Sequence, residues 1–184
     1  MVALERSTPY TPWPAGRANA YAAEIERVAT GVFGSVGNLA APLVSVSRTS
    51  AFNVANALDT VVPWQGADED PNVWWDPSVP TRLTCRTAGL YISIAQIRYP
   101  ATTAVGVRNS LMLKNGTSPG ANSFANQSQP GSTSGAGPTL SYAKKVRLLV
   151  GEWLALNVYQ TSGGTMALQT DFGGTTIDVF RIGP

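Results

Sequence analysis

The chain has 184 residues, with 13 Lys and Arg, 11 Asp and Glu, no His and one Cys. Its net charge of +2 is too small to indicate a nucleic-acid partner, and no apolar run reaches the roughly 18 residues of a membrane span. The lack of histidine removes the usual general base and the commonest metal ligand, and one cysteine excludes an internal disulfide. The 18 glycines and 13 prolines are typical of a turn-rich all-β protein.

The N-terminal segment predicts an extended tail followed by a short α-helix. Pro9, Pro12 and Pro14 favour extended backbone, and residues 17–33 carry apolar side chains at alternating spacings of three and four. Such a short helix is unstable alone, so we expect it to pack either on its own domain or on a partner. The side chains expected to anchor this segment are Trp13, Tyr21, Ile25 and Val28.

Three glycines between residues 31 and 37 predict a hinge after the helix. We therefore expect two parts, an anchoring segment over 1–40 and a β domain over 41–184. The Trp13-Pro14-Ala15-Gly16 run and the helix after it resemble the segments that begin many phage tail-fibre proteins. The first ten residues lack the basic start and apolar core of a signal peptide, so we expect synthesis in a host cytoplasm without export.

The β domain reads as about nine or ten short strands separated by turn signals, which predicts an antiparallel sandwich or jelly roll. Two long segments, 65–80 and 117–138, are expected to be loops without regular structure. Asn115-Gly116 predicts a hairpin turn. The expected strands are 44–47, 52–54, 60–64, 82–86, 90–99, 107–114, 139–150, 153–160, 165–170 and 175–182. In 107–114 the side chains expected to point outward are Arg108, Ser110, Met112 and Lys114.

The strand expected after a turn at Thr87-Ala88-Gly89 is apolar on both of its faces over its first five residues. Successive side chains in a strand point to opposite faces, so its residues divide into two sets. These sets are Tyr91, Ser93, Ala95, Ile97 and Tyr99 on one face, and Leu90, Ile92, Ile94, Gln96 and Arg98 on the other. Covering both faces requires either a third layer or another copy of the protein.

The same stretch resembles the shared motif of the tumour necrosis factor and complement 1q globular-head superfamily. The resemblance rests on Leu83, on Gly89-Leu90-Tyr91-Ile92 and on Gln96, whereas Cys85 and Ser93 replace larger apolar residues. The run from Val146 to Glu152 and the last strand are also similar to segments of that superfamily.

This resemblance covers residues 42–184 and implies an antiparallel jelly roll that forms a homotrimer. It also implies that Ile92, Ile94 and Gln96 lie in the trimer interface. A charge placed in that interface should prevent assembly, so we expect Ile94→Asp to give monomer or insoluble protein. A change such as Lys114→Asp is expected to be silent.

The acidic run Asp68-Glu69-Asp70 has two interpretations. Solvated loop charge is the simpler one, and the alternative is a calcium site, because carboxylate oxygens are the ligands that calcium prefers. Cys85 is interpreted as a small buried side chain and not as a nucleophile, because no histidine is present to activate it.

Three aromatic side chains in the two long loops, Trp74, Trp75 and Phe124, are candidates for contact with a host or ligand. The alternative for the two tryptophans is packing at the end of the sandwich or in an interface, because exposing an indole ring is costly. Adjacent side chains on a loop seldom point the same way, so one ring can pack while the other stays free.

These features together predict a non-enzymatic structural or adhesin protein of a phage virion, made in the host cytoplasm and released by lysis. We expect a homotrimeric tail-tip, fibre or decoration module, attached to other virion proteins through residues 1–40. Its partner would be a host-surface glycan or protein, with no nucleic acid, no membrane insertion and no cofactor other than the calcium considered above. The alternatives are a free lectin-like binding module of the same fold and a carbohydrate-active enzyme.

Overall fold

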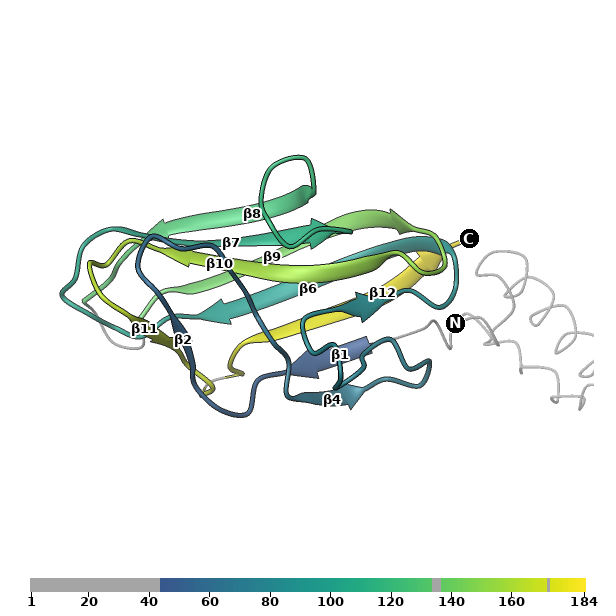
Figure 1. Cartoon of the computed structure of the whole chain (residues 1–184), viewed down its shortest axis with the longest axis horizontal. Helices are drawn as coiled ribbons and strands as arrows, with labels where there is room; N and C mark the ends of the chain where they lie inside the picture. Colours follow the sequence, from purple (N-terminus) through teal and green to yellow (C-terminus); the bar gives the residue numbers. More distant parts are fainter. Residues whose placement is uncertain (1–43, 134–136, 172) are drawn as a thin grey trace, which may run out of the picture. The chain divides into compact units, whose positions relative to one another are not determined.

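A computed structural model describes residues 44–133, 137–171 and 173–184, and all the regular secondary structure in these ranges is β-strand (Figure 1). None of the described residues forms a helix long and apolar enough to span a membrane. The expected helix over 17–33, the hinge, the 40/41 boundary and the anchoring residues Trp13, Tyr21, Ile25 and Val28 lie outside the described residues.

Five strands form one antiparallel sheet in the order β4-β1-β12-β6-β9. The strand β6 lies second from one edge of this sheet, where it pairs with β12 on one side and with the edge strand β9 along its whole length on the other. The strands are β1 (Val44–Ser47), β4 (Gly66–Glu69), β6 (Gly89–Arg98), β9 (Thr139–Leu148) and β12 (Thr176–Gly183).

A second antiparallel sheet has the order β3-β10-β7-β8, with β5 also pairing with β10. A small third sheet pairs β2 with β11. The strands of these two sheets are β2 (Phe52–Val54), β3 (Thr60–Val61), β5 (Leu83–Thr84), β7 (Val107–Lys114), β8 (Ser123–Pro130), β10 (Trp153–Gln160) and β11 (Met166–Leu168). The predicted all-β antiparallel fold is confirmed for the described residues.

The hydrophobic core is formed by side chains that the two large sheets direct toward each other. In β1, for example, Val44 and Val46 are fully buried while Ser45 between them is half-exposed. The β10 strand contributes Leu154, Leu156 and Val158 from the other sheet. Alternation with period two thus supplies one apolar face from each sheet, and these faces form the core of the sandwich.

The two faces expected for the strand over 90–99 are confirmed along β6. Tyr91, Ser93, Ala95 and Ile97 are fully buried between the sheets, whereas alternate residues on the opposite face are only half-buried. Arg98, at the end of the strand, is also buried, and its Nε lies 3.0 Å from Oδ1 of Asp171.

The turn expected at Thr87-Ala88-Gly89 needs correction. Gly89 is the first residue of β6, and the preceding strand, β5, belongs to the other sheet, where it pairs with β10. A Cβ on Gly89 would lie 2.7 Å from Nε of Arg181 and 2.8 Å from the carbonyl oxygen of Gly183. This glycine is therefore required by the close approach of β12, and not by a turn conformation.

The outward direction expected for alternate residues of β7 was wrong. Arg108, Ser110 and Met112 are fully buried. Met112 joins the main core, and the Ser110 hydroxyl lies 2.8 Å from the Tyr142 hydroxyl. The Arg108 guanidinium donates to the carbonyl oxygens of Val107 and Ala104. Polar side chains on this face are buried because they find partners inside the sandwich.

The long loop expected over 117–138 contains an eight-residue strand, β8, in which seven residues pair with β7. The connection between these strands is the eight-residue segment 115–122 and not a two-residue hairpin, although Asn115 does adopt the left-handed conformation with φ 53°. The strand expected over 60–64 is limited to Thr60–Val61. The polar composition of β8 suits its position at the edge of the sheet and conceals it in the sequence.

Candidate functional site: the outer face of the β6 sheet

The candidate site is the face of the β4-β1-β12-β6-β9 sheet that points away from the core, which we call the outer face. The β6 strand contributes Leu90, Ile92, Ile94 and Gln96, all of them half-buried. The pairing of β6 with β12 and β9, and of β12 with β1, brings further residues to the same face. These are Ser45 and Ser47 of β1, Thr176, Asp178 and Phe180 of β12, and Ser141, Ala143, Lys145 and Arg147 of β9.

The centre of the outer face is apolar. Ile92 lies between Phe180 on β12 and Lys145 on β9, and Ile94 lies between Asp178 and Ala143 in the next row. Phe180 has 39% of its surface exposed, although aromatic side chains are usually buried. A sheet face that meets only water is normally polar, so this apolar centre is typical of a surface that packs against another molecule.

Polar groups surround that centre on both sides. On the β12 side, the Asp178 carboxylate accepts a hydrogen bond of 2.5 Å from the Ser45 hydroxyl. On the β9 side, Arg147 donates to the carbonyl oxygen of Pro184, while Lys145 is exposed. Gln96 donates from Nε2 to the carbonyl oxygen of Gly174 at 3.2 Å, so its amide is already engaged within the chain.

The structure brings the sequence-predicted residues Ile92, Ile94 and Gln96 together on the outer face. Phe180, Asp178 and Lys145, which lie beside them, were not predicted as site residues. Their membership follows from the register of β12 and β9 against β6, which pairs residues far apart in the sequence. The alternation of polar and apolar residues within 175–182 and 139–148 could have indicated an outward face, but not which residues stand opposite one another.

Trp74 is fully buried and contacts Tyr91 edge to face, with ring centroids 5.1 Å apart. Its ring is therefore part of the core and is covered from solvent. Trp75 is half-buried against the core and donates from its indole nitrogen to Pro80. Phe124 is also half-buried and packs on the core from β8. Packing, the alternative considered for the tryptophans, is what the structure shows for Trp74.

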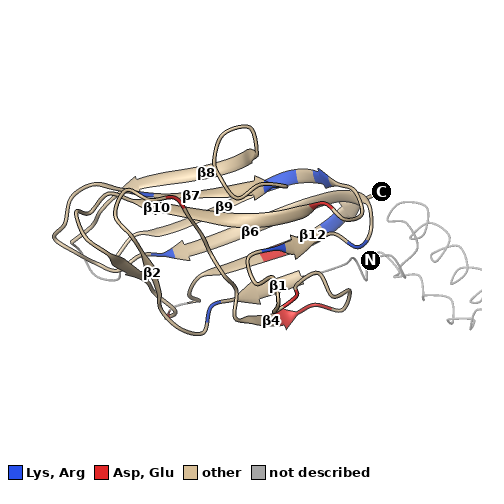
Figure 2. Cartoon of the chain, in the orientation of Figure 1, with Lys and Arg blue, Asp and Glu red and all other residues tan. Residues whose placement is uncertain are grey.

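The three acidic residues considered as an alternative calcium site do not form a metal cluster in the described part of the chain. Asp68 and Glu69 are exposed on the edge strand β4 (Figure 2). Asp70 instead accepts hydrogen bonds from the backbone nitrogens of Trp74 and Trp75, at 2.8 and 2.9 Å. Its carboxylate holds the turn that directs Trp74 inward, which accounts for this acidic residue without a metal ion.

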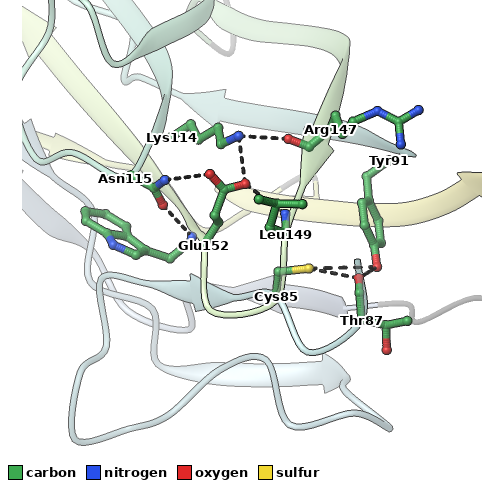
Figure 3. Close-up of polar contacts among 9 residues, drawn as sticks. Cys85, Thr87, Tyr91, Lys114, Asn115, Arg147, Leu149 and Glu152 are labelled. Atoms are coloured by element: carbon green, nitrogen blue, oxygen red, sulfur yellow. Dashed lines mark hydrogen bonds and ion pairs between the residues drawn. The ribbon is translucent and has the colours of Figure 1, made fainter. Parts of the chain in front are cut away.

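A network of polar contacts holds the turn between β9 and β10 (Figure 3). The Glu152 carboxylate lies 2.7 Å from Nζ of Lys114 and accepts hydrogen bonds from the Leu149 backbone nitrogen and the Asn115 amide. The hydrogen bond from Lys114 is the main cause that lowers the pKa of Glu152, with the Leu149 and Asn115 hydrogen bonds acting in the same direction. We call this network the Glu152 clasp.

Cys85 lies near the clasp and is fully buried. Its thiol is 3.0 Å from the carbonyl oxygen of Thr87, to which the Tyr91 hydroxyl also donates (Figure 3). Burial raises the pKa of the Cys85 thiol, so the reactive thiolate is disfavoured. The interpretation of Cys85 as a small buried side chain is confirmed.

No protein-family model and no curated protein matches the sequence. Solved structures do match the fold. A crystal structure of murine APRIL at pH 5.0 aligns with a TM-score of 0.57 at 11% identity, over 76% of this chain and 97% of that chain. The structure of Eiger TNF from S. frugiperda aligns with a TM-score of 0.54 at 14% identity, over 76% and 90%.

The globular domain of zebrafish complement 1qA aligns with a lower TM-score of 0.48, at 14% identity over 77% of this chain and 97% of that chain. The assignment of the fold rests on the first two structures. The β domain has the jelly-roll fold of tumour necrosis factor-type proteins, so the fold that the sequence motif implied is confirmed.

Proposed function

We propose that this chain is a non-enzymatic structural or adhesin protein of a phage virion, whose β domain assembles as a homotrimer through the outer face. The observation that supports assembly is the apolar centre of that face, formed by Leu90, Ile92, Ile94 and Phe180. Covering these side chains with another copy would remove their remaining exposed surface from water. Burying a fully exposed large side chain contributes roughly 1.5–3 kcal/mol, and these partly buried side chains contribute a part of that each.

A three-fold assembly is supported by the motif resemblance and by the tumour necrosis factor-type fold. In a closed ring of three copies the same contact recurs between each copy and the next, so the outer face of every copy is covered. It also meets the requirement, evident in the sequence, that both faces of β6 be covered.

The virion assignment is supported by the likeness of residues 13–28 to the anchoring segments of tail-fibre proteins. In this proposal residues 1–40 attach the trimer to other virion proteins, and the β domain contacts a glycan or protein of the host surface. Trp75 and Phe124, both half-buried, stay candidates for that contact. Trp74 contributes by supporting the fold, because its ring is covered.

The substitution Ile94→Asp tests the proposed interface. A carboxylate at the centre of the outer face would be stripped of water on assembly, so we expect the variant to be a folded monomer or to precipitate. The matched control is Val107→Asp, which places the same charge on a strand of the other sheet where 42% of the valine surface is exposed.

Light scattering coupled to gel filtration reports the mass of each variant. The proposal expects trimer for Val107→Asp and loss of trimer for Ile94→Asp. A soluble Ile94→Asp variant that remains fully trimeric would rule out this interface. Lys114→Asp, expected from the sequence to be silent, is unsuitable as a control because Lys114 belongs to the Glu152 clasp.

A further inference from the structure

The charges of the outer face are divided between its two sides. Asp178 lies on β12, Lys145 and Arg147 lie on β9, and the apolar side chains of β6 separate them. Two strand spacings, roughly 9–10 Å, separate β12 from β9, and Asp178 and Lys145 also stand in different rows. Neither is in an ion pair within the described part of the chain.

Asp178 is poorly placed for a surface that loses its water. Its carboxylate is half-buried already, stands directly opposite Ile94, and accepts one hydrogen bond, from the Ser45 hydroxyl at 2.5 Å. A buried carboxylate with a single neutral donor is destabilising, because it loses most of its hydration without a compensating charge. An assembly that covers Ile94 must therefore supply a cation to Asp178.

Lys145 is the cation best suited to that role. It is exposed, stands opposite Ile92, and makes no hydrogen bond or ion pair with the residues that the structure describes. Arg147 and Arg181 are engaged instead with main-chain carbonyl oxygens, those of Pro184 for Arg147 and of Gly183 and Ala88 for Arg181. Lys144, the residue before Lys145, pairs with Ser93 and so belongs to the opposite face.

We propose that Asp178 of one copy forms an ion pair with Lys145 of the next copy, with Ser45 holding the carboxylate in place. This rests on the proposed trimer and identifies the polar contact that fixes how its copies fit together. In a ring, one side of each face meets the opposite side of the next, so the acidic side of each copy meets a basic side. Charge complementarity of this kind sets register and excludes mismatched packing.

Charge exchange in the full-length chain tests the pair. Asp178→Lys and Lys145→Asp each place like charges together. For each single variant we therefore expect the trimer to dissociate, in a dilution series, at a protein concentration at least tenfold higher than for the wild type. The double variant, Asp178→Lys with Lys145→Asp, restores opposite charges and should recover most of that loss. Lys144→Asp, the neighbouring residue on the opposite face, is the matched control and should leave the trimer unchanged.

The readout is the mass measured by light scattering across a dilution series, with thermal unfolding to check that each variant folds. Lys145→Met provides a milder test, because an exposed lysine can lose its charge without disturbing the fold; it should also weaken the trimer. Single variants as stable as the wild type, or a double variant no better than the singles, would overturn the pair while the trimer stands. A monomeric wild-type chain would overturn the trimer itself, and the pair with it.

Discussion

Gly89 begins β6 at a point where β12 passes too close for any side chain. A Cβ there would lie 2.7 Å from Nε of Arg181 and 2.8 Å from the Gly183 carbonyl oxygen, and backbone cannot yield as readily as a flexible side chain. The glycine therefore allows β12 to lie against β6 at the end of the outer face that carries Leu90.

We expect Gly89→Ala to destabilise the fold by about 1–3 kcal/mol, the usual cost of overpacking a close contact. Thermal unfolding measures this as a lower midpoint. Gly66→Ala is the matched control, because Gly66 also begins a strand of the same sheet but has no atom within 4 Å of its would-be Cβ. Equal midpoints for the two variants would contradict the close approach described for Gly89.

The sequence predicted the faces of β6 but not those of β7, and the reason is physical. In β6 an apolar strand alternates with period two and the assignment follows directly. In β7, Arg108 and Ser110 appear outward because they are polar, yet partners contributed by residues 104 and 142 satisfy them inside the sandwich. Such partners become visible only when the two sheets are brought together.

At the scale of elements, the Glu152 clasp joins the end of β7 to the turn between β9 and β10. Lys114 ends β7, and it contacts both the Glu152 carboxylate and the Arg147 carbonyl oxygen (Figure 3). Asn115 accepts from the Trp153 backbone nitrogen and donates to Glu152. The sequence resemblance marked Glu152 as part of a motif, and the structure gives its role.

We expect Glu152→Gln to lower stability at neutral pH by about 0.5–1.5 kcal/mol, since the pair is partly exposed and screened by solvent. The folded-state pKa of Glu152 lies below the ordinary value of about 4.3, so its charge stabilises the fold above that value. The stabilisation is lost as pH falls through the lower folded-state pKa. Thermal unfolding of the wild type and of Glu152→Gln from pH 7 to pH 3 should therefore show the difference between their unfolding midpoints becoming smaller in acid.

Glu69→Gln is the control for this series, because Glu69 is an exposed carboxylate on β4. The unfolding midpoint of Glu69→Gln should equal that of the wild type across this pH series. A gap between Glu152→Gln and the wild type that stays constant down to pH 3 would mean that the charge of Glu152 does not stabilise the turn.

The segments 65–80 and 117–138 were expected to be loops that contact the host. Their structures differ from that prediction for related reasons. Trp74 and Trp75 follow Asp70, whose carboxylate binds their backbone nitrogens and so turns the first ring into the core. The second segment contains β8, whose Gln, Asn and Ser residues resemble a loop although they pair with β7. Composition alone does not separate an edge strand from a loop.

At the scale of the whole molecule, the proposal gives separate tasks to the two parts of the chain. The core and the outer face both lie within residues 44–184, so a truncated chain of residues 41–184 should fold and form the same trimer. It should also keep its contact with the host surface but fail to enter phage particles, because the proposed anchoring segment is missing.

Particle incorporation after expression of the truncated chain checks this division, and residues 1–40 fused to an unrelated trimeric protein should be incorporated. Normal incorporation of the truncated chain would show that the anchor lies elsewhere. It would favour the alternative of a free binding module only if the truncated chain still bound its surface ligand.

The central claim is that the outer face is covered by other copies of the same chain. The most direct test is the mass of the full-length protein in solution, measured by light scattering at several concentrations. We predict a mass three times the chain mass of 19.4 kDa, maintained on dilution, and a trimeric truncated chain as well. A stable, soluble monomer at every concentration would contradict it.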